Sequence, residues 1–412
     1  MSCRQTTVNG VSSLDSVFLA STIAAIGPRP DVTTAEVDFA ALTTLRVGGA
    51  PAATVVCRSA EAVAEVVGTL DGQDVPLLVV GGGSNLVVGQ DVDDRVVVLI
   101  AAGGSEGESD TPVQIDTETG LVRAFAGVVW DDLVAATVEA GLGGVECLSG
   151  IPGSVGATPV QNVGAYGAEV SQVLHRVQLF DRTTGELGWV SPESLDLAYR
   201  YSNLKFTNRA VVTAVEFQLT TDGLSAPLRF GELARRLGVT EEEGAAGQAR
   251  RPVAEVRDAV LALRAGKGMV LDEDDHDTWS AGSFFTNPVV TGEDTRDAVI
   301  DAVTSRCGAE TAASMPCYPA GTDVDGTPQF KFSAAWLIER AGFPKGWQVP
   351  ADQGGTGRAG LSTKHTLALT NRGSAVSEDI VQLARAVRAG VQDAFGVTLE
   401  PEPVWIGVSI EG

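Results

Sequence analysis

Two glycine-dense turns are the residues of this sequence best suited to chemistry. The first is Gly81-Gly82-Gly83-Ser84-Asn85, which follows the apolar run Val75 to Val80. The second, Gly150 to Gly167, contains Gly150, Gly153, Gly156, Gln161, Asn162, Gly164, Ala165, Tyr166 and Gly167. Glycine amides can approach an anion closely because no side chain stands between them and the ligand. The second turn adds the side-chain amides of Gln161 and Asn162, so the pair predicts a long, polyphosphate-containing cofactor.

The first turn alone does not establish that the chain binds such a cofactor. Leu86 stands where the GxGxxG fingerprint has its last glycine, and GxxxxGK[ST] does not occur. A tight turn between two strands explains Gly81 to Asn85 equally well. The sequence therefore predicts neither a Rossmann dinucleotide site nor a nucleotide hydrolase.

The cysteines and histidines indicate no metal site and no disulfide framework. No CxxC pair occurs, and the histidines at 175, 276 and 365 lie far apart without an HExxH motif. A reducing cytoplasm fits such cysteine usage. The mildly apolar stretch Val17 to Ile26 is too short to span a bilayer and lacks a strongly basic start, so we expect no signal peptide. The five scattered cysteines are Cys3, Cys57, Cys147, Cys307 and Cys317.

Regular elements must position the first turn. Ser59 can cap a helix on which Val63, Val66, Val67 and Leu70 share one face. Val75 to Val80 and Val96 to Ile100 read as buried strands on either side of the turn. A polar, acidic loop from residue 103 to 110 then separates this part from the next.

Further elements precede and follow the second turn in the sequence. A short helix begins at Asp131 and Asp132 and ends near Gly141, and strands are expected at Val173 to Phe180 and Val211 to Leu219. A helix from Pro252 to Gly266 and a long helix from Ser377 to Phe395, ended by Gly396, have apolar residues at helical spacing. We expect solvated loops at Glu241 to Glu243 and Asp272 to Asp277, and a terminal strand from Val397 to Val408.

The overall charge restricts the partners. The chain has 412 residues, enough for two or three domains, and a formal net charge of -24. Nucleic acids and anionic membranes bind basic patches, so we expect neither as a partner. An anionic substrate would need a few basic residues gathered inside a cleft.

Seven motifs, taken together and in order, resemble the UDP-N-acetylenolpyruvoylglucosamine reductase family. Any one of them could arise by chance, whereas the whole ordered set, spanning roughly residues 40 to 408, is highly specific. The motif at Tyr199 suggests the subclass with a tyrosine-bearing loop over the substrate. The motifs are Thr43 to Gly49, Gly81 to Asn85, Gly150 to Gly167, Tyr199 to Ser202, Ala281 to Pro288, Ala334 to Glu339 and Leu399 to Glu402.

The resemblance implies an α+β fold. It consists of a vanillyl-alcohol-oxidase-type FAD-binding region of two subdomains plus an α/β substrate-binding domain. The implied divisions are an N-terminal extension (1–38), the FAD-binding region (39–224), the substrate-binding domain (225–396) and a C-terminal strand with Glu402 (397–412). The implied reaction is the NADPH-dependent reduction of UDP-N-acetylglucosamine enolpyruvate to UDP-N-acetylmuramate through non-covalent FAD, in peptidoglycan synthesis. A cytoplasmic monomer without a metal is expected.

Three residues take catalytic roles by this resemblance. Ser283 matches the proton donor, although a serine after Gly282 could simply cap a turn. Arg200 matches the residue that forks two bonds to the substrate carboxylate. Glu402 would polarise the same group while protonated, and Glu400 is its alternative.

Four residues match positions around the UDP-sugar. Lys267 follows a predicted helix end, where a cation would also complement the helix dipole. Asn287, Arg264 and Tyr318 are weaker candidates than Lys267, and a structural role explains His365 equally well. Phe230 departs from the tyrosine that family members often carry, which leaves part of the diphosphate grip unassigned unless Tyr201 or Tyr318 replaces it. The four predicted substrate residues are Tyr199, Lys267, Asn287 and Tyr318.

Two other functions stay open at this point. One is an oxidase of the same FAD fold acting on an alcohol, with a flavin attached covalently through a residue such as Cys147. The other is a nucleotide-sugar-binding protein without catalysis, which would be colourless when purified.

Overall fold

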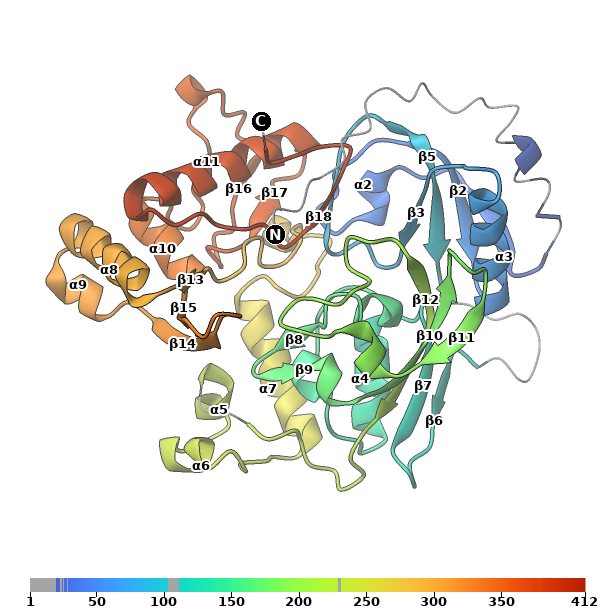
Figure 1. Cartoon of the computed structure of the whole chain (residues 1–412), viewed down its shortest axis with the longest axis horizontal. Helices are drawn as coiled ribbons and strands as arrows, with labels where there is room; N and C mark the ends of the chain where they lie inside the picture. Colours follow the sequence, from blue (N-terminus) through green and yellow to red (C-terminus); the bar gives the residue numbers. More distant parts are fainter. Residues whose placement is uncertain are drawn as a thin grey trace. The chain divides into compact units, whose positions relative to one another are not determined.

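A computed structural model describes residues 20–22, 24, 26–27, 29–102, 111–228 and 231–411. Phe230, the acidic loop 103–110 and residues 1–19 of the predicted extension lie outside the described residues. The chain forms two compact units, each drawn from separate stretches of sequence (Figure 1). Unit 1 comprises Met1–Leu42, Gly49–Gly83 and Asp91–Arg264, and unit 2 comprises Thr43–Gly48, Ser84–Gln90 and Ala265–Gly412.

The first sheet of unit 1 has the strand order β1-β2-β5-β3. Strand β1 is antiparallel to β2, whereas β2, β5 and β3 are parallel. Helix α3 begins at the predicted cap, because the Ser59 hydroxyl accepts the Ala62 N–H at 3.0 Å. The predicted apolar face of this helix is buried. The prediction of this helix and of two strands is confirmed. The bounds are β1 (Val32–Ala35), β2 (Pro51–Cys57), α3 (Ala60–Asp71), β3 (Leu77–Val80) and β5 (Val92–Ile100).

The second sheet of unit 1 is antiparallel, with the order β11-β10-β12-β7-β6. Its central strand β12 is buried along nearly its whole length, which explains why most of its residues are apolar. The two strands predicted here and the helix at Asp131 are confirmed. The bounds are β6 (Val113–Ile115), β7 (Leu121–Phe125), α4 (Trp130–Glu139), β10 (Leu174–Asp181), β11 (Leu187–Val190) and β12 (Ala210–Gln218).

Short elements complete unit 1. The predicted solvated loop at Glu241 to Glu243 was wrong, since these residues begin helix α6. Thr240 and Glu243 form a capping box, in which each side chain accepts the other's N–H. The helix predicted from Pro252 to Gly266 is confirmed as α7. The bounds are α2 (Phe39–Leu42), β8 (Gly164–Ala165), β9 (Ala168–Glu169), α5 (Glu232–Arg236), α6 (Glu241–Ala245) and α7 (Val253–Gly266).

Unit 2 is built around the long helix α11, which begins and ends as predicted. Its apolar face packs into a core with α10, α8 and small sheets. The sheets have the orders β13-β15-β14, β16-β17 and β18-β4. The bounds are β4 (Leu86–Val88), β13 (Val289–Thr291), α8 (Glu293–Cys307), α9 (Ala309–Ala313), β14 (Cys317–Thr322), β15 (Pro328–Phe332), α10 (Ala334–Ala341), β16 (Ala359–Leu361), β17 (Leu369–Asn371), α11 (Ser377–Phe395) and β18 (Val404–Ile406).

The terminal strand is much shorter than predicted. The strand itself is Val404–Ile406, which pairs with β4, whereas Pro401 forms only an isolated antiparallel bridge with Phe285. Glu400 and Glu402 therefore lie in the segment before the strand. Pro401 and Pro403 have no N–H to donate to a ladder, which accounts for the shortening.

Two properties concern the described residues alone. None of their helices combines the length and the apolar character that crossing a membrane requires. Among the same residues, no three histidine, cysteine or acidic side chains lie together as metal ligands would.

Candidate active site

The two glycine turns meet in unit 1. A Cβ atom on Gly82 would stand 2.5 Å from the Cα of Gly153, and one on Gly81 would collide with the Ser154 hydroxyl. Only glycine lets the two backbones come this close. The boundary between the units falls after Gly83, so Ser84 and Asn85 belong to unit 2.

This junction offers backbone donors to a ligand. Within the part of the chain that the structure describes, the N–H groups of Gly82 and Gly153 have no hydrogen-bond partner. Gly82 is exposed and Gly153 is half-buried, so both turns remain open on one side. Unused amides in a side-chain-free cradle suit the diphosphate of a dinucleotide, and the residues present therefore fit FAD.

Helix α4 positions the second turn. The Gly153 carbonyl accepts the Trp130 N–H at 3.0 Å, and the Asp131 carboxylate accepts the Gly150 N–H at 2.6 Å. Arg257 of α7 pairs with the same carboxylate at 2.7 Å. Burial opposes the charge of Asp131, but the bonds from Arg257 and Gly150 hold its pKa below the usual range. Asp131 therefore stays charged and anchors the turn.

Asn162 holds the second turn to the loop of Tyr199. Its side chain is buried and donates to the Ala198 carbonyl at 3.0 Å, while its oxygen accepts the Ser171 N–H at 3.0 Å. Its backbone adopts a left-handed conformation with φ of 46°. The amide that was predicted to contact the cofactor thus serves the protein itself.

Arg200 lies against the predicted flavin segment. Its guanidinium donates to the Gly164 carbonyl and lies 4.9 Å from the ring centre of Tyr199. The backbone at Arg200 is left-handed, with φ of 55°, and its carbonyl accepts from the buried Lys205 ammonium at 3.4 Å. The structure thus brings the first predicted catalytic residue to the hairpin that contains Gly164.

The tip of that hairpin carries Tyr166 and Gly167. Strands β8 and β9 pair on either side of it, and both tip residues have positive φ. Burial raises the pKa of the Tyr166 hydroxyl, while the positive charge of the half-buried Arg264 acts in the opposite direction. Arg264, a weaker candidate for the UDP-sugar, therefore lies near the flavin segment within unit 1.

Ser283 and Glu402 come from neighbouring segments of unit 2. The Phe284 carbonyl, next to Ser283, accepts the Glu402 N–H at 2.9 Å, and the Glu400 carbonyl accepts the Thr286 N–H at 3.0 Å. Ser283 and Glu402 are half-buried, whereas Glu400 is exposed and lies 3.8 Å from Arg388. The geometry favours Glu402 over Glu400 as the acid near Ser283.

The predicted substrate residues of unit 2 are more dispersed. The Asn287 side-chain oxygen accepts the Ala334 N–H at 2.9 Å and so joins its segment to the start of α10. Tyr318 is exposed on β14, opposite Lys331 of β15. Lys267 is half-buried directly after α7, and the N–H of His365 bonds the Ser362 hydroxyl at 3.2 Å.

Two residues have supporting roles that were not predicted. Asp131 was read only as a helix start, although an acid in a first turn can also bind a neighbouring loop. Asn85 was assigned to the flavin, yet its side chain donates to the Glu402 carbonyl at 3.4 Å and its own carbonyl accepts the Val404 N–H at 2.9 Å. No local pattern could pair residues so distant in sequence.

Comparisons with known proteins point to one family. Residues 274–406 match the family described as UDP-N-acetylenolpyruvoylglucosamine reductase, C-terminal domain, and residues 51–191 match an FAD binding domain. The crystal structure of UDP-N-acetylenolpyruvylglucosamine reductase from Thermus caldophilus superposes with a TM-score of 0.57 at 24% identity, covering 91% of this chain and 99% of that one. At that identity the likeness shows the fold alone.

Relatives of known name are much closer in sequence. UDP-N-acetylenolpyruvoylglucosamine reductase from Corynebacterium jeikeium is 69% identical over 397 residues, 90% of each chain. The enzyme of the same name from Corynebacterium diphtheriae is 56% identical over the full length of both, and that from Mycobacterium tuberculosis is 52% identical over 90% of this chain and 94% of its own. The predicted family, α+β fold and FAD dependence are confirmed, and the chain belongs to the UDP-N-acetylenolpyruvoylglucosamine reductase family.

Proposed function

We propose that Arg200, Ser283 and Glu402 are the catalytic residues with which this family member reduces UDP-N-acetylglucosamine enolpyruvate to UDP-N-acetylmuramate. The reaction belongs to peptidoglycan synthesis and uses NADPH and FAD. Bound FAD supplies the hydride, which originates from NADPH, to the end carbon of the enolpyruvyl group. The remaining chemistry, which is binding, charge stabilisation and proton delivery, is assigned to side chains and amides of the protein.

The two glycine turns would hold the FAD. The backbone amides from Gly81 to Asn85 and from Gly150 to Gly167 are proposed to face its diphosphate, with Gln161 and Tyr166 beside them. The unpartnered N–H groups of Gly82 and Gly153 support this assignment. Asn162 contributes indirectly, since its amide keeps the second turn in place.

Ser283 is proposed to deliver the proton. Hydride addition leaves negative charge shared between the substrate carboxylate and the carbon next to it, and that carbon must then be protonated. The Ser283 hydroxyl gives its proton to this carbon and recovers one from water. A carbanionic centre is basic enough to take a proton from a group as weakly acidic as serine.

Arg200 and Glu402 are proposed to stabilise the developing charge. A guanidinium can fork two bonds to a carboxylate, and the bond to Gly164 together with the ring of Tyr199 orients that of Arg200. Glu402 is proposed to polarise the same group while protonated. Tyr199, Lys267, Asn287 and Tyr318 are proposed to bind the UDP-sugar.

One observation carries the proposal. The backbone bond between Glu402 and Phe284, the residue after Ser283, joins a hydroxyl-bearing and a carboxyl-bearing segment in one unit, although 119 positions separate Ser283 from Glu402. A pair of groups that could donate and relay a proton is what the second half of the reaction requires.

The test is the variant Ser283→Ala, studied without oxygen by stopped-flow absorbance. NADPH should bleach the flavin at the wild-type rate, because that step needs no proton from Ser283. Recovery of colour on adding the enolpyruvyl UDP-sugar should slow by about 10²- to 10⁴-fold, the usual contribution of a general acid. Recovery at the wild-type rate would remove Ser283 from the mechanism.

The flavin is proposed to be bound without a covalent link. Cys147, the cysteine nearest the second turn in sequence, is buried in the core of unit 1, and burial raises the pKa of its thiol. A buried, neutral thiol is a poor nucleophile. Mass spectrometry of the denatured protein should therefore give the mass of the chain alone.

We also propose a cytoplasmic monomer. The scattered cysteines, of which the four in the described part of the chain are free thiols, support a reducing compartment. Light scattering coupled to gel filtration should give a mass near 42.6 kDa. A mass of twice that value would contradict the monomer.

A further inference from the structure

Ser283 lies in a segment that is held on both sides by backbone bonds of unit 2. On one side, the Trp279 carbonyl accepts the Asn371 N–H at 3.0 Å, and the Phe284 N–H donates to Leu367 at 2.8 Å. Ser280 forms an antiparallel bridge with Thr370 between these two bonds. On the other side lies the segment of Glu402. The position of Ser283 therefore depends on how residues 279–284 lie beside residues 367–371.

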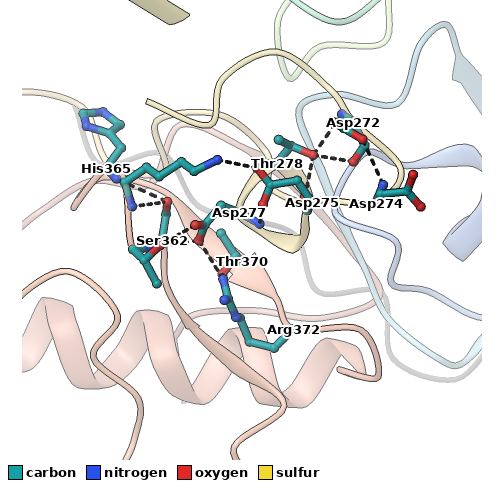
Figure 2. A network of polar contacts seen from close by, with 11 residues as sticks. Asp272, Asp274, Asp275, Asp277, Thr278, Ser362, His365, Thr370 and Arg372 are labelled. Atoms are coloured by element: carbon teal, nitrogen blue, oxygen red, sulfur yellow. Dashed lines mark hydrogen bonds and ion pairs between the residues drawn. The ribbon is translucent and has the colours of Figure 1, made fainter. Parts of the chain in front are cut away.

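Asp277 closes one end of this pairing. Asp277 is only 5% exposed, and its carboxylate accepts the Thr363 N–H at 2.9 Å and an N–H of Arg372 Nη1 at 2.7 Å. It also accepts the Thr363 hydroxyl. Figure 2 shows Asp277 between Ser362 on one side and Thr370 with Arg372 on the other. The carboxylate thus ties both ends of the β16–β17 hairpin to the stretch that leads to Ser283.

The segment between Asp277 and Ser283 has little other freedom. The Ser280 carbonyl accepts the Thr44 hydroxyl at 2.7 Å, and the Ser280 hydroxyl accepts the Gly282 N–H at 3.2 Å. The Trp279 ring contacts both the guanidinium of Arg46, 4.1 Å from its ring centre, and the ring of His276. A displacement at Asp277 would therefore be transmitted along the chain to Ser283 and not absorbed by a loose loop.

We propose that Asp277, locked to Thr363 and Arg372, is a positioning residue for Ser283. It does not touch the substrate; it fixes the segment that presents the proton donor. The proposal rests on the proposed role of Ser283. It predicts an effect on the proton-dependent step alone, because flavin reduction by NADPH does not use this segment as a proton donor.

The chain offers a matched control in the same unit. Asp379 is also buried, and its carboxylate accepts the Thr356 hydroxyl at 2.7 Å, the Val376 N–H at 2.8 Å and Arg358 at 3.0 Å. It has the same three kinds of partner as Asp277, but it serves the start of α11 instead of the Ser283 segment. Asp277→Asn and Asp379→Asn each leave an amide of the same shape and remove one buried negative charge.

The experiment compares both variants with the wild type in the anaerobic stopped-flow assay. Flavin reduction by NADPH should be unchanged in all three. Recovery of colour with the enolpyruvyl UDP-sugar should slow by about tenfold to a hundredfold in Asp277→Asn, the range expected for a misplacement near 1 Å. Asp379→Asn should recover at the wild-type rate. The solvent deuterium isotope effect on recovery should rise in Asp277→Asn only, since proton delivery then limits the rate more strongly.

The outcomes separate this proposal from the role of Ser283. If Ser283→Ala is slow while Asp277→Asn matches Asp379→Asn, the positioning role is wrong and the role of Ser283 stands. If Ser283→Ala is as fast as the wild type, Ser283 is not the proton donor, and the positioning role of Asp277 is then wrong as well. Should Asp277→Asn not fold, Thr363→Val and Thr356→Val remove one hydroxyl from each site and carry the same comparison, with Thr363→Ser expected to behave as the wild type.

Discussion

Gly82 shows how much of the site depends on a missing side chain. Its Cα lies against Gly153, where a Cβ would stand 2.5 Å from a backbone atom that cannot move without moving the second turn. The glycine pattern predicted a cofactor loop because such positions are rare outside close backbone approaches. It could not predict that the two turns would touch, since contact between residues 82 and 153 is a property of the folded chain.

We expect Gly82→Ala to lose flavin. The added methyl group must push the two turns apart, so the amides proposed to face the diphosphate would no longer converge. The measured quantity is the flavin absorbance per chain after purification. Gly188→Ala is the control, because Gly188 also lies in unit 1 and a Cβ there meets nothing within 4 Å. Equal flavin content in both variants would contradict the assignment of the turns.

The burial of Asp277 could not be predicted from the sequence. The acidic segment from Asp272 to Asp277 was predicted to be a solvated loop, and for Asp277 this was wrong. Its partner Arg372 lies 95 positions further along the chain, so nothing near Asp277 in the sequence indicates a buried ion pair. Ser283, by contrast, could be proposed from the sequence because a recognisable motif surrounds it.

At the scale of elements, helices that depend on nearby residues were predicted well, whereas the length of a strand that depends on a distant partner was not. The helices at Ser59, Pro252 and Ser377 were predicted from caps and apolar spacing, which act within a few residues. Helix α6 was missed although its capping box is visible as Thr240 and Glu243, because three consecutive acids suggested solvent. The terminal strand was predicted too long because its length depends on its partner, β4. The paired residues Val404 and Leu86 are 318 positions apart in the sequence.

The tie between helices α4 and α7 should make stability depend on pH. Bonds from Arg257 and Gly150 lower the pKa of Asp131 in the folded chain. A lowered pKa means that the stabilisation is complete above the unfolded value of about 3.9 and is lost as the pH falls towards and through the folded value. Asp131→Asn should therefore be less stable than the wild type at pH 7.

Urea unfolding at a series of pH values checks this expectation. The difference in unfolding midpoint between the wild type and Asp131→Asn should be largest near neutral pH and should shrink below about pH 4. Asp116→Asn is a control for an exposed acid whose pKa is lowered only by bonds within its own turn. A difference that stays constant down to acid pH would show that Asp131 acts through something other than its charge.

At the scale of the whole molecule, charge and family membership carry different information. From composition we expect no nucleic acid as a partner, but composition could not identify the substrate. The ordered motifs identified the family, and the relatives confirm it. The two compact units meet in sequence at Arg264 and Ala265, inside α7. The boundary near residue 225 between the FAD-binding region and the substrate-binding domain stays a prediction, because the order of elements does not show which of them bind FAD and which bind the substrate.

The net charge of -24 should oppose the approach of both anionic ligands. Salt screens this repulsion, since the screening length falls from about 30 Å at 0.01 M to about 8 Å at 0.15 M. We therefore expect kcat/KM for NADPH and for the UDP-sugar to rise over this range of ionic strength. A steady fall of kcat/KM over the same range would mean that local basic residues dominate the encounter.

The most direct test of the account uses the wild-type protein and two additions without oxygen. We predict that NADPH bleaches the visible band of the bound flavin and that the enolpyruvyl UDP-sugar then restores it, with one UDP-N-acetylmuramate formed for each flavin reoxidised. In deuterated water the product should carry deuterium at the carbon next to its carboxylate. A flavin that stays bleached after the sugar is added would contradict the account.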